Sequence, residues 1–216
     1  MKNIIFIAAP AAGKGTASEK LCEKYGYVHI STGEILRSMA SVDSDFGRDL
    51  KSRLQEGKLI SDNIVYEALE KLLSMPDLKN GYILDGFPRN LEQAEEYDKI
   101  LERINGDLGV VIELATPKDI LKKRITGRYI CKECGQTHNV LTGVNTPEKD
   151  GVCNKCGGEL YQREDDNEVS FETRYQTYLD KTLPLIDFYK KKNVLYSIES
   201  VDPMETFKEI EAIIND

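Results

Sequence analysis

The strongest constraint on the fold is a continuous apolar run near the start of the chain, Asn3-Ile4-Ile5-Phe6-Ile7-Ala8. A short run without polar alternation is typical of a strand that is buried on both faces. A stretch rich in Ala, Pro and Gly follows at residues 9–15, and residues 16–25 then read as a helix that ends near Gly26. A buried strand that turns directly into a helix indicates a parallel sheet covered by helices, so the sequence predicts an α/β fold.

Four further apolar runs repeat this pattern, at residues 27–30, 82–84, 109–114 and 194–198. Strands that alternate with helical sequence predict a parallel five-stranded sheet with right-handed crossovers and flanking helices. A chain of 216 residues fits one α/β domain with insertions better than two independent domains. Residues 203–214 place apolar side chains at helical spacing, and we expect a packing helix there.

Two segments interrupt the alternation of strands and helices. Residues 31–60 are polar and helical in character, whereas residues 128–162 are rich in Cys, Gly, Asn and Lys. Both are expected to be insertions at the carboxyl edge of the sheet, where open α/β folds bind ligands. The expected core therefore consists of residues 1–30, 61–127 and 163–216.

The overall charge and the hydropathy pattern exclude several classes of protein. The formal net charge is −8, which disfavours nonspecific nucleic-acid binding because phosphate backbones attract basic surfaces. No apolar run reaches the roughly 18 residues that a membrane span requires. The first residues show no signal-peptide pattern, so we expect a cytoplasmic location with neither a membrane nor a nucleic acid as partner.

Residues 8–16, Ala-Ala-Pro-Ala-Ala-Gly-Lys-Gly-Thr, stand between the first strand and the first helix, where a phosphate-binding loop belongs. Successive backbone amides there can surround a polyphosphate, and Lys14 would place a positive charge beside the β- and γ-phosphates. The strict pattern G-x-x-x-x-G-K-[ST] is not met, because Ala8 replaces the first glycine and Gly15 follows the lysine. A tight turn with a helix cap is the alternative interpretation.

The cysteines of the second insertion have the spacing of a metal site. Cys131 and Cys134 form one C-x2-C pair, and Cys153 and Cys156 form a second after 18 intervening residues. This arrangement suits tetrahedral Zn²⁺ in a structural role, since four ligands leave no open position. Redox-active or free thiols are the alternatives, disfavoured because neither pair follows a thioredoxin-like pattern. Cys22 stands apart and is expected to be a small buried side chain.

Five motifs, taken together and in this order, resemble the nucleoside monophosphate kinase family, most closely the long-lid bacterial adenylate kinases. They are Gly13-Lys14-Gly15-Thr16, Ser31-Thr32-Gly33-Glu34-Ile35-Leu36-Arg37, Asp85-Gly86-Phe87-Pro88-Arg89, Arg124-Ile125-Thr126-Gly127-Arg128 and Tyr161-Gln162-Arg163-Glu164-Asp165-Asp166. The resemblance covers essentially the whole chain. It implies a P-loop core, an NMP-binding insertion at residues 31–60 and a zinc-binding lid at residues 128–162. It also implies Mg²⁺-dependent transfer of the γ-phosphoryl group of ATP to AMP by a monomer.

The resemblance also assigns roles to individual residues. The expected catalytic residues are Lys14, Asp85, Arg89, Arg124, Arg128, Arg163 and Arg174. The expected ATP-binding residues are Ala11, Ala12, Gly13, Lys14, Gly15, Thr16, Arg128, Thr137 and His138. The expected AMP-binding residues are Thr32, Arg37, Gly86, Arg89, Gln93, Arg163 and Arg174. Arginine suits these positions because its planar fork contacts phosphate bidentately.

The resemblance also implies what several of these side chains do. Arg124, Arg163 and Arg174 are expected to close over the transferring group, and Asp85 to organise Mg²⁺ through its water shell, with a helix N-cap as the alternative. Thr32 and Gln93 are expected to favour adenine in the acceptor. His138 is expected either to stack on the adenine of ATP or to be an exposed loop residue.

Three other interpretations remain open at this stage. The chain could be a kinase for UMP, CMP or GMP, or a binding module whose zinc knot contacts nucleic acid. It could also be a weakly active homologue, because the family usually has glycine where this chain has Ala8 and Ala11. An alanine that must adopt a positive φ costs roughly 1 kcal/mol. His29, in a strand, is expected to be structural.

Overall fold

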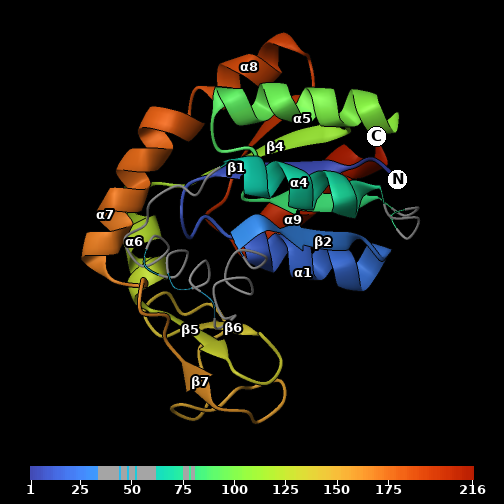
Figure 1. Ribbon diagram of the computed structural model, residues 1–216. Helices are drawn as coiled ribbons and strands as arrows, with labels where there is room; N and C mark the ends of the chain where they lie inside the picture. Colours follow the sequence, from blue (N-terminus) through green and yellow to red (C-terminus); the bar gives the residue numbers. More distant parts are fainter. Residues whose placement is uncertain (34–43, 45–47, 49–51, 53–61, 75–77, 79–80) are drawn as a thin grey trace.

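The computed structural model describes residues 1–33, 44, 48, 52, 62–74, 78 and 81–216, and its main feature is a parallel five-stranded sheet (Figure 1). The spatial order of the strands is β2-β3-β1-β4-β8, and every neighbouring pair is parallel. The strands are β1 (Ile4–Ala8), β2 (Val28–Ser31), β3 (Tyr82–Asp85), β4 (Val110–Ala115) and β8 (Leu195–Glu199). The predicted parallel sheet is confirmed.

Helices cover both faces of this sheet. They are α1 (Lys14–Tyr25), α4 (Asp62–Leu73), α5 (Leu91–Ile104), α6 (Lys118–Thr126), α7 (Glu168–Thr177), α8 (Leu185–Lys191) and α9 (Pro203–Asn215), and a π-helical turn at Tyr178–Thr182 joins α7 to the segment before α8. Apolar side chains of α4, α5 and α8 pack on one face with Ile5 and Ile7, whereas those of α1, α6, α7 and α9 pack on the other with Ile4 and Phe6. Because both of its faces are covered, the central strand β1 is continuously apolar, whereas the edge strand β8 carries exposed polar side chains.

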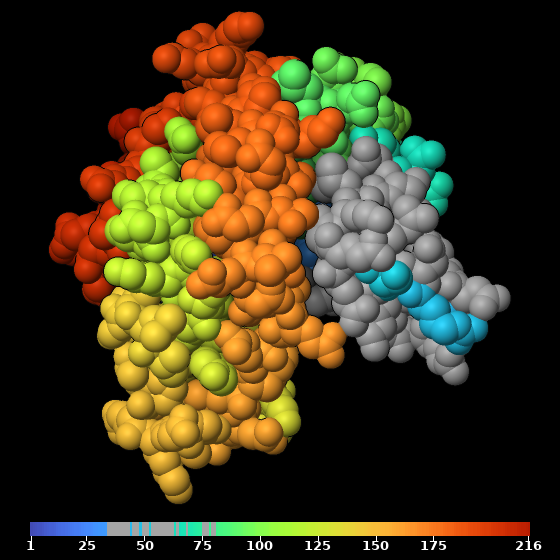
Figure 2. Space-filling view, turned by 90° about the vertical axis from the view of Figure 1, so that its left-hand side faces the viewer, coloured from blue at the N-terminus to red at the C-terminus, as the bar shows by residue number. Residues whose placement is uncertain are grey.

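Residues of the second insertion form a separate lobe that extends from the main sheet (Figure 1). Its strands β5 (Arg128–Cys131), β6 (Thr137–Asn139) and β7 (Leu160–Tyr161) are antiparallel, in the order β6-β5-β7. Figure 2 shows this lobe beneath α6 and α7. The lobe's apolar cluster comprises buried Cys131, Cys153 and Leu160, with Tyr129 packed against them. A cluster of this size cannot stabilise a domain by burial alone.

The expected insertion at residues 31–60 lies largely outside the described residues. Within the described part of the chain, every helix is too short or too polar to cross a bilayer.

The loop between β1 and α1 requires two left-handed backbone conformations. Ala11 has φ +65° and Gly13 has φ +105°, whereas Ala8 lies within the extended strand β1. Glycine adopts a positive φ without a steric penalty, but the Cβ of alanine makes it unfavourable. The expected cost of the two alanine replacements therefore falls on Ala11 and not on Ala8.

We predict that Ala11→Gly stabilises the protein by roughly 0.5–1 kcal/mol. The left-handed penalty for alanine, about 1–2 kcal/mol, exceeds the roughly 0.4–1 kcal/mol of chain entropy that glycine adds to the unfolded state. Urea unfolding followed by circular dichroism measures the difference. Ala12→Gly is the matched control, and it should destabilise because Ala12 is buried and does not have a positive φ. Equal destabilisation by both variants would contradict the strain at Ala11.

Candidate functional site

A cleft of about 1320 Å³ opens between the carboxyl edge of the main sheet and the three-stranded lobe. The loop after β1, the end of β3, the end of α6, strand β5 and helix α7 all contribute to its walls. Open parallel sheets bind ligands at this edge because the loops that follow the strands converge there. A ligand-binding site is therefore expected in this cleft.

The phosphate loop and the start of α1 form one wall of the cleft, and residues 11–16 all line it. Helix α1 begins at Lys14, directly after Gly13, which has no side chain to cap the helix. Its first turn, Lys-Gly-Thr-Ala, carries no acidic side chain, so the positive end of the helix dipole is available to an anion. The wall is therefore suited to bind phosphate.

Lys14 lies beside this helix terminus and contacts the loop backbone. Its Nζ lies 3.4 Å from the carbonyl oxygen of Ala8 and 3.5 Å from that of Ala9. Burial lowers the pKa of Lys14, and the Asp85 carboxylate, 4.0 Å away, offsets part of this effect. Arg89, Arg174 and Arg128 lower the pKa further. The ammonium group therefore lies among other positive charges that repel it. A bound anion would reduce this repulsion.

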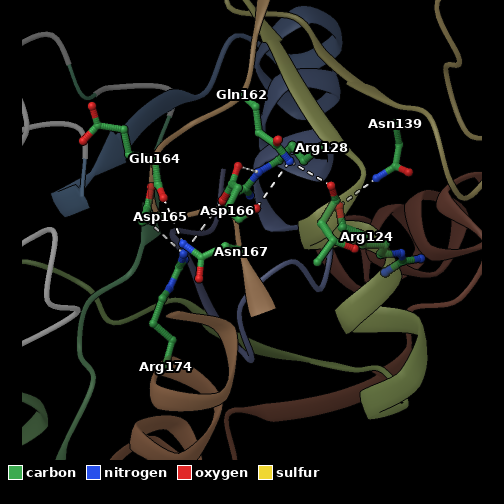
Figure 3. A network of polar contacts seen from close by, with 10 residues as sticks. Arg124, Arg128, Asn139, Gln162, Glu164, Asp165, Asp166, Asn167 and Arg174 are labelled. Atoms are coloured by element: carbon green, nitrogen blue, oxygen red, sulfur yellow. Dashed lines mark hydrogen bonds and ion pairs between the residues drawn. The ribbon is translucent and has the colours of Figure 1, made fainter. Parts of the chain in front are cut away.

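Arg128 and Arg174 are held by two aspartates that follow β7 (Figure 3). Arg128 donates two hydrogen bonds to the buried Asp166, one of them from Nε at 2.8 Å. Arg174 Nη1 lies 3.0 Å from Asp165 Oδ2. Burial lowers the pKa of Arg174 to about 10, and repulsion from Arg128 contributes. Arg163 also lines the cleft. The aspartates fix the orientation of the guanidinium groups without removing the excess positive charge.

Arg124 lines the cleft but does not contact this cluster in the structure, and its expected closure over a transferring group together with Arg163 and Arg174 stays a prediction. Its Nη1 donates to the carbonyl oxygens of Ala12 (3.3 Å) and Ser200 (3.0 Å), and its Nη2 donates to that of Val201 (2.6 Å). In Figure 3 its side chain extends away from Arg128 and Arg174. The guanidinium satisfies backbone acceptors that the fold brings to the end of α6.

Asp85 ends β3 and faces two basic groups. Lys14 Nζ lies 4.0 Å from Oδ1, and His29 Nε2 lies 3.5 Å from Oδ2. Burial alone would raise the pKa of Asp85, but His29 and Lys14 outweigh it and the pKa lies below its usual value. The carboxylate is therefore ionised and suits a hydrated divalent cation. The N-cap alternative is wrong, because Asn90 caps α5.

The proximity of His29 to this carboxylate was missed from the sequence. His29 lines the cleft, and strand β2 places it opposite Ile83 in the neighbouring strand β3, two residues before Asp85. A polar residue near the carboxyl end of an apolar strand was the available signal.

The remaining residues expected to bind AMP form a hydrogen-bonded turn beside the cleft. Thr32 Oγ1 donates to the Gly86 carbonyl oxygen (2.9 Å), and so does Arg89 Nε (2.7 Å). Gln93 Oε1 accepts from the Arg89 amide (2.7 Å). Thr32 and Gln93 are buried, so in this structure they support the turn and do not line the cleft. Arg37 lies outside the described residues.

The four lobe cysteines lie close enough to share one metal ion. Their Sγ atoms all lie within 4.8 Å of one another, with 3.4 Å between Cys131 and Cys156 and 3.7 Å between Cys134 and Cys153. A tetrahedron with Zn–S bonds of about 2.3 Å has edges of about 3.8 Å, whereas a disulfide requires about 2.05 Å. The backbone N–H of Cys134 lowers the pKa of Cys131 to about 7, whereas the neighbouring thiols raise the pKa of Cys156 to about 12 despite the Gly158 N–H, so the thiols titrate as one set. The thiols fit Zn²⁺.

His138 is not the exposed loop residue of one of its two expected placements. The residue is 1% exposed, Nδ1 lies 3.0 Å from the Asn145 carbonyl oxygen, and Nε2 lies 3.4 Å from Cys153 Sγ. It lies at the wall of the cleft, and its stacking on the adenine of ATP stays a prediction. The neighbouring Thr137 is half-buried and lines the cleft.

Comparison with known proteins accounts for this set of features. The family model for adenylate kinase matches residues 6–194. The adenylate kinase of Archaeoglobus fulgidus is 42% identical, with 98% of this chain and 97% of that protein aligned. The adenylate kinase of Thermodesulfovibrio yellowstonii is 44% identical over 98% of both chains, and that of Thermosipho melanesiensis is 42% identical over 98% and 99%. Because the family model spans most of the chain and these relatives align over nearly their whole length, this chain belongs to the adenylate kinase family.

Proposed function

We propose that this chain catalyses the reversible, Mg²⁺-dependent transfer of the terminal phosphoryl group of ATP to AMP, which yields two ADP. The observation that carries the proposal is the convergence of Lys14, Arg89, Arg128 and Arg174 on one cleft beside the start of α1. Such a concentration of cations is unfavourable without an anionic ligand, and two nucleotides supply many anionic oxygens.

On the donor side, residues 11–16 are proposed to bind the ATP phosphates through backbone amides and the Lys14 ammonium group. Arg128, Arg163 and Arg174 are proposed to neutralise the charge on the transferring group, and Thr137 to contact ATP from the lobe. Phosphoryl transfer requires alignment of the substrates and stabilisation of charge more than covalent chemistry. Backbone amides, an ammonium group and guanidinium groups can meet both requirements. Mg²⁺ bound with ATP would neutralise further phosphate charge, and Asp85 would hold it through water ligands.

On the acceptor side, Arg89 is proposed to bind the AMP phosphate, and Arg37 stays a sequence-based prediction for the same role. Thr32, Gly86 and Gln93 keep the turn around Arg89 in shape, as their hydrogen bonds indicate. A preference for AMP over UMP and CMP is expected from Thr32 and Gln93 and is tested directly by comparing acceptors.

The domain organisation proposed for catalysis follows the sequence boundaries. Residues 1–30, 61–127 and 163–216 would form the core, residues 31–60 the AMP-binding insertion and residues 128–162 a lid that excludes water during transfer. Lys155 supports contact between lobe and core, because its Nζ lies 3.2 Å from Glu23 and 3.5 Å from Glu19 on α1. We also propose a monomeric enzyme, as the resemblance to the family implies.

The activity is tested with a coupled assay for ADP formed from ATP, AMP and Mg²⁺, with UMP, CMP and GMP as parallel acceptors. We expect AMP to be used much faster than the other acceptors. Lys14→Ala and Arg89→Ala should each reduce kcat/KM by at least roughly 10²–10³-fold, the effect of removing a buried group that stabilises transition-state charge. Lys191→Ala, an exposed position on α8, is the matched control and should change nothing. Retention of more than about a tenth of wild-type kcat/KM in either cleft variant contradicts these roles.

We further propose that Cys131, Cys134, Cys153 and Cys156 bind one structural Zn²⁺. Removal of the metal with a chelator should lower the melting temperature by at least about 5 °C, the shift expected for roughly 2 kcal/mol in a chain of this size. The main sheet should stay folded, because its apolar clusters do not include these cysteines.

Differential scanning calorimetry and metal analysis check this prediction. Cys156→Ser should bind less zinc, whereas Cys22→Ser, which changes a cysteine outside the cluster, should retain one metal ion per chain. If chelation leaves melting unchanged, or if both serine variants bind metal equally well, the cysteines are not the ligands.

A further inference from the structure

Ser200 connects the last strand of the sheet to the phosphate loop at the opposite end of the sequence. It directly follows β8 and is 3% exposed. Its Oγ donates a 2.8 Å hydrogen bond to the carbonyl oxygen of Ala12. Ala12 lies between Ala11 and Gly13, the two loop residues with positive φ. One buried hydroxyl group therefore contacts the most constrained part of the loop.

The hydrogen bond from Ser200 to the Ala12 carbonyl oxygen determines which way the next backbone N–H, that of Gly13, points. The peptide between Ala12 and Gly13 is planar, and in a trans peptide the carbonyl group and the following N–H point in opposite directions. A donor that binds the Ala12 carbonyl from the side of β8 therefore directs the Gly13 N–H away from Ser200. Gly13 lines the cleft at the start of α1, where the amides of a phosphate loop face their ligand.

The Ala12 carbonyl also accepts from Arg124, which makes the role of Ser200 distinguishable. Arg124 Nη1 lies 3.3 Å from this oxygen, a longer contact than that of Ser200. Arg124 divides its donors among three carbonyl oxygens and lines the cleft, where nucleotide phosphates would compete for it. Ser200 is buried and held by its strand, so its bond to the loop is independent of any nucleotide.

We propose that Ser200 is a positioning residue of the ATP site, which holds the 12–13 peptide in the orientation that binds phosphate. This inference rests on the proposed assignment of the phosphate loop to ATP. The strained Ala11 makes the restraint necessary, because alanine does not favour the left-handed conformation that the loop needs. Ser200 lies outside the turn that is proposed to bind AMP, so its effect is specific to the donor nucleotide.

The test compares Ser200→Ala with Ser197→Ala, the same substitution three residues earlier in β8. Ser197 Oγ donates to Glu113 and does not touch the loop. Calorimetric titration with ATP should show a five- to tenfold weaker affinity for Ser200→Ala, about the value of one neutral hydrogen bond. Affinity for AMP should stay within about twofold, and Ser197→Ala should bind both nucleotides as the wild type does.

A second variant separates positioning from simple stabilisation. In an Ala11→Gly background the loop adopts its conformation without strain, so Ser200→Ala should then weaken ATP binding by less than about twofold. A structural role alone would lower the melting temperature in both backgrounds and would not produce this rescue or the difference between ATP and AMP.

The outcomes separate this inference from the proposed function. If Ser200→Ala binds ATP as tightly as the wild type, or if it loses ATP and AMP affinity equally, the positioning role is overturned while the ATP site stands. If the wild type itself binds no ATP, the proposed ATP site is overturned together with this inference.

Discussion

Like charges repel strongly where water is partly excluded, and this molecule holds several cations together in such a place. Burial lowers the pKa of Lys14 and of Arg174, and the neighbouring Arg89 and Arg128 lower both further. The folded chain must hold these side chains in the cleft, because a charged group is more stable when it is fully hydrated and away from like charges. The parallel sheet provides the scaffold, since the ends of β1 and β3 and the helices α1 and α7 bring these groups to one edge.

The acidic groups around the cleft orient the cations without cancelling their charge. Asp166 is buried and receives two bonds from Arg128, while Asp165 fixes Arg174 (Figure 3). Bidentate pairs restrict the planar guanidinium group to one orientation, which reduces the entropy lost when a phosphate binds. Asp85 is separate, with Lys14 and His29 beside it, and is suited to a hydrated cation. In both places the acidic groups orient the basic side chains before a ligand binds.

The lobe is a polar segment that has a defined shape without a large apolar core. Its buried apolar cluster is small, and four thiols lie within reach of one metal ion at its centre. Metal ligation can replace an apolar core in such a segment. Lys155, next to Cys156, also contacts Glu19 and Glu23 of α1 through exposed ion pairs, which contribute little to stability. With the proposed Zn²⁺ bound, metal ligation more than apolar burial would hold the shape of the lobe.

Local patterns in the sequence determined the five strands, the helices that follow them, the phosphate loop and the paired cysteines. These features depend on neighbours in the chain: uninterrupted apolar runs, a Gly-Lys-Gly-Thr turn after a strand, and a fixed C-x2-C spacing. Only the tertiary structure decided that Arg124 binds backbone carbonyls, that His138 is buried beside Cys153, and that Thr32 and Gln93 support a turn. The bond from Ser200 to Ala12 joins residues 188 positions apart. Such contacts depend on where packing brings side chains and carbonyl groups together, and spacing along the chain carries no information about that.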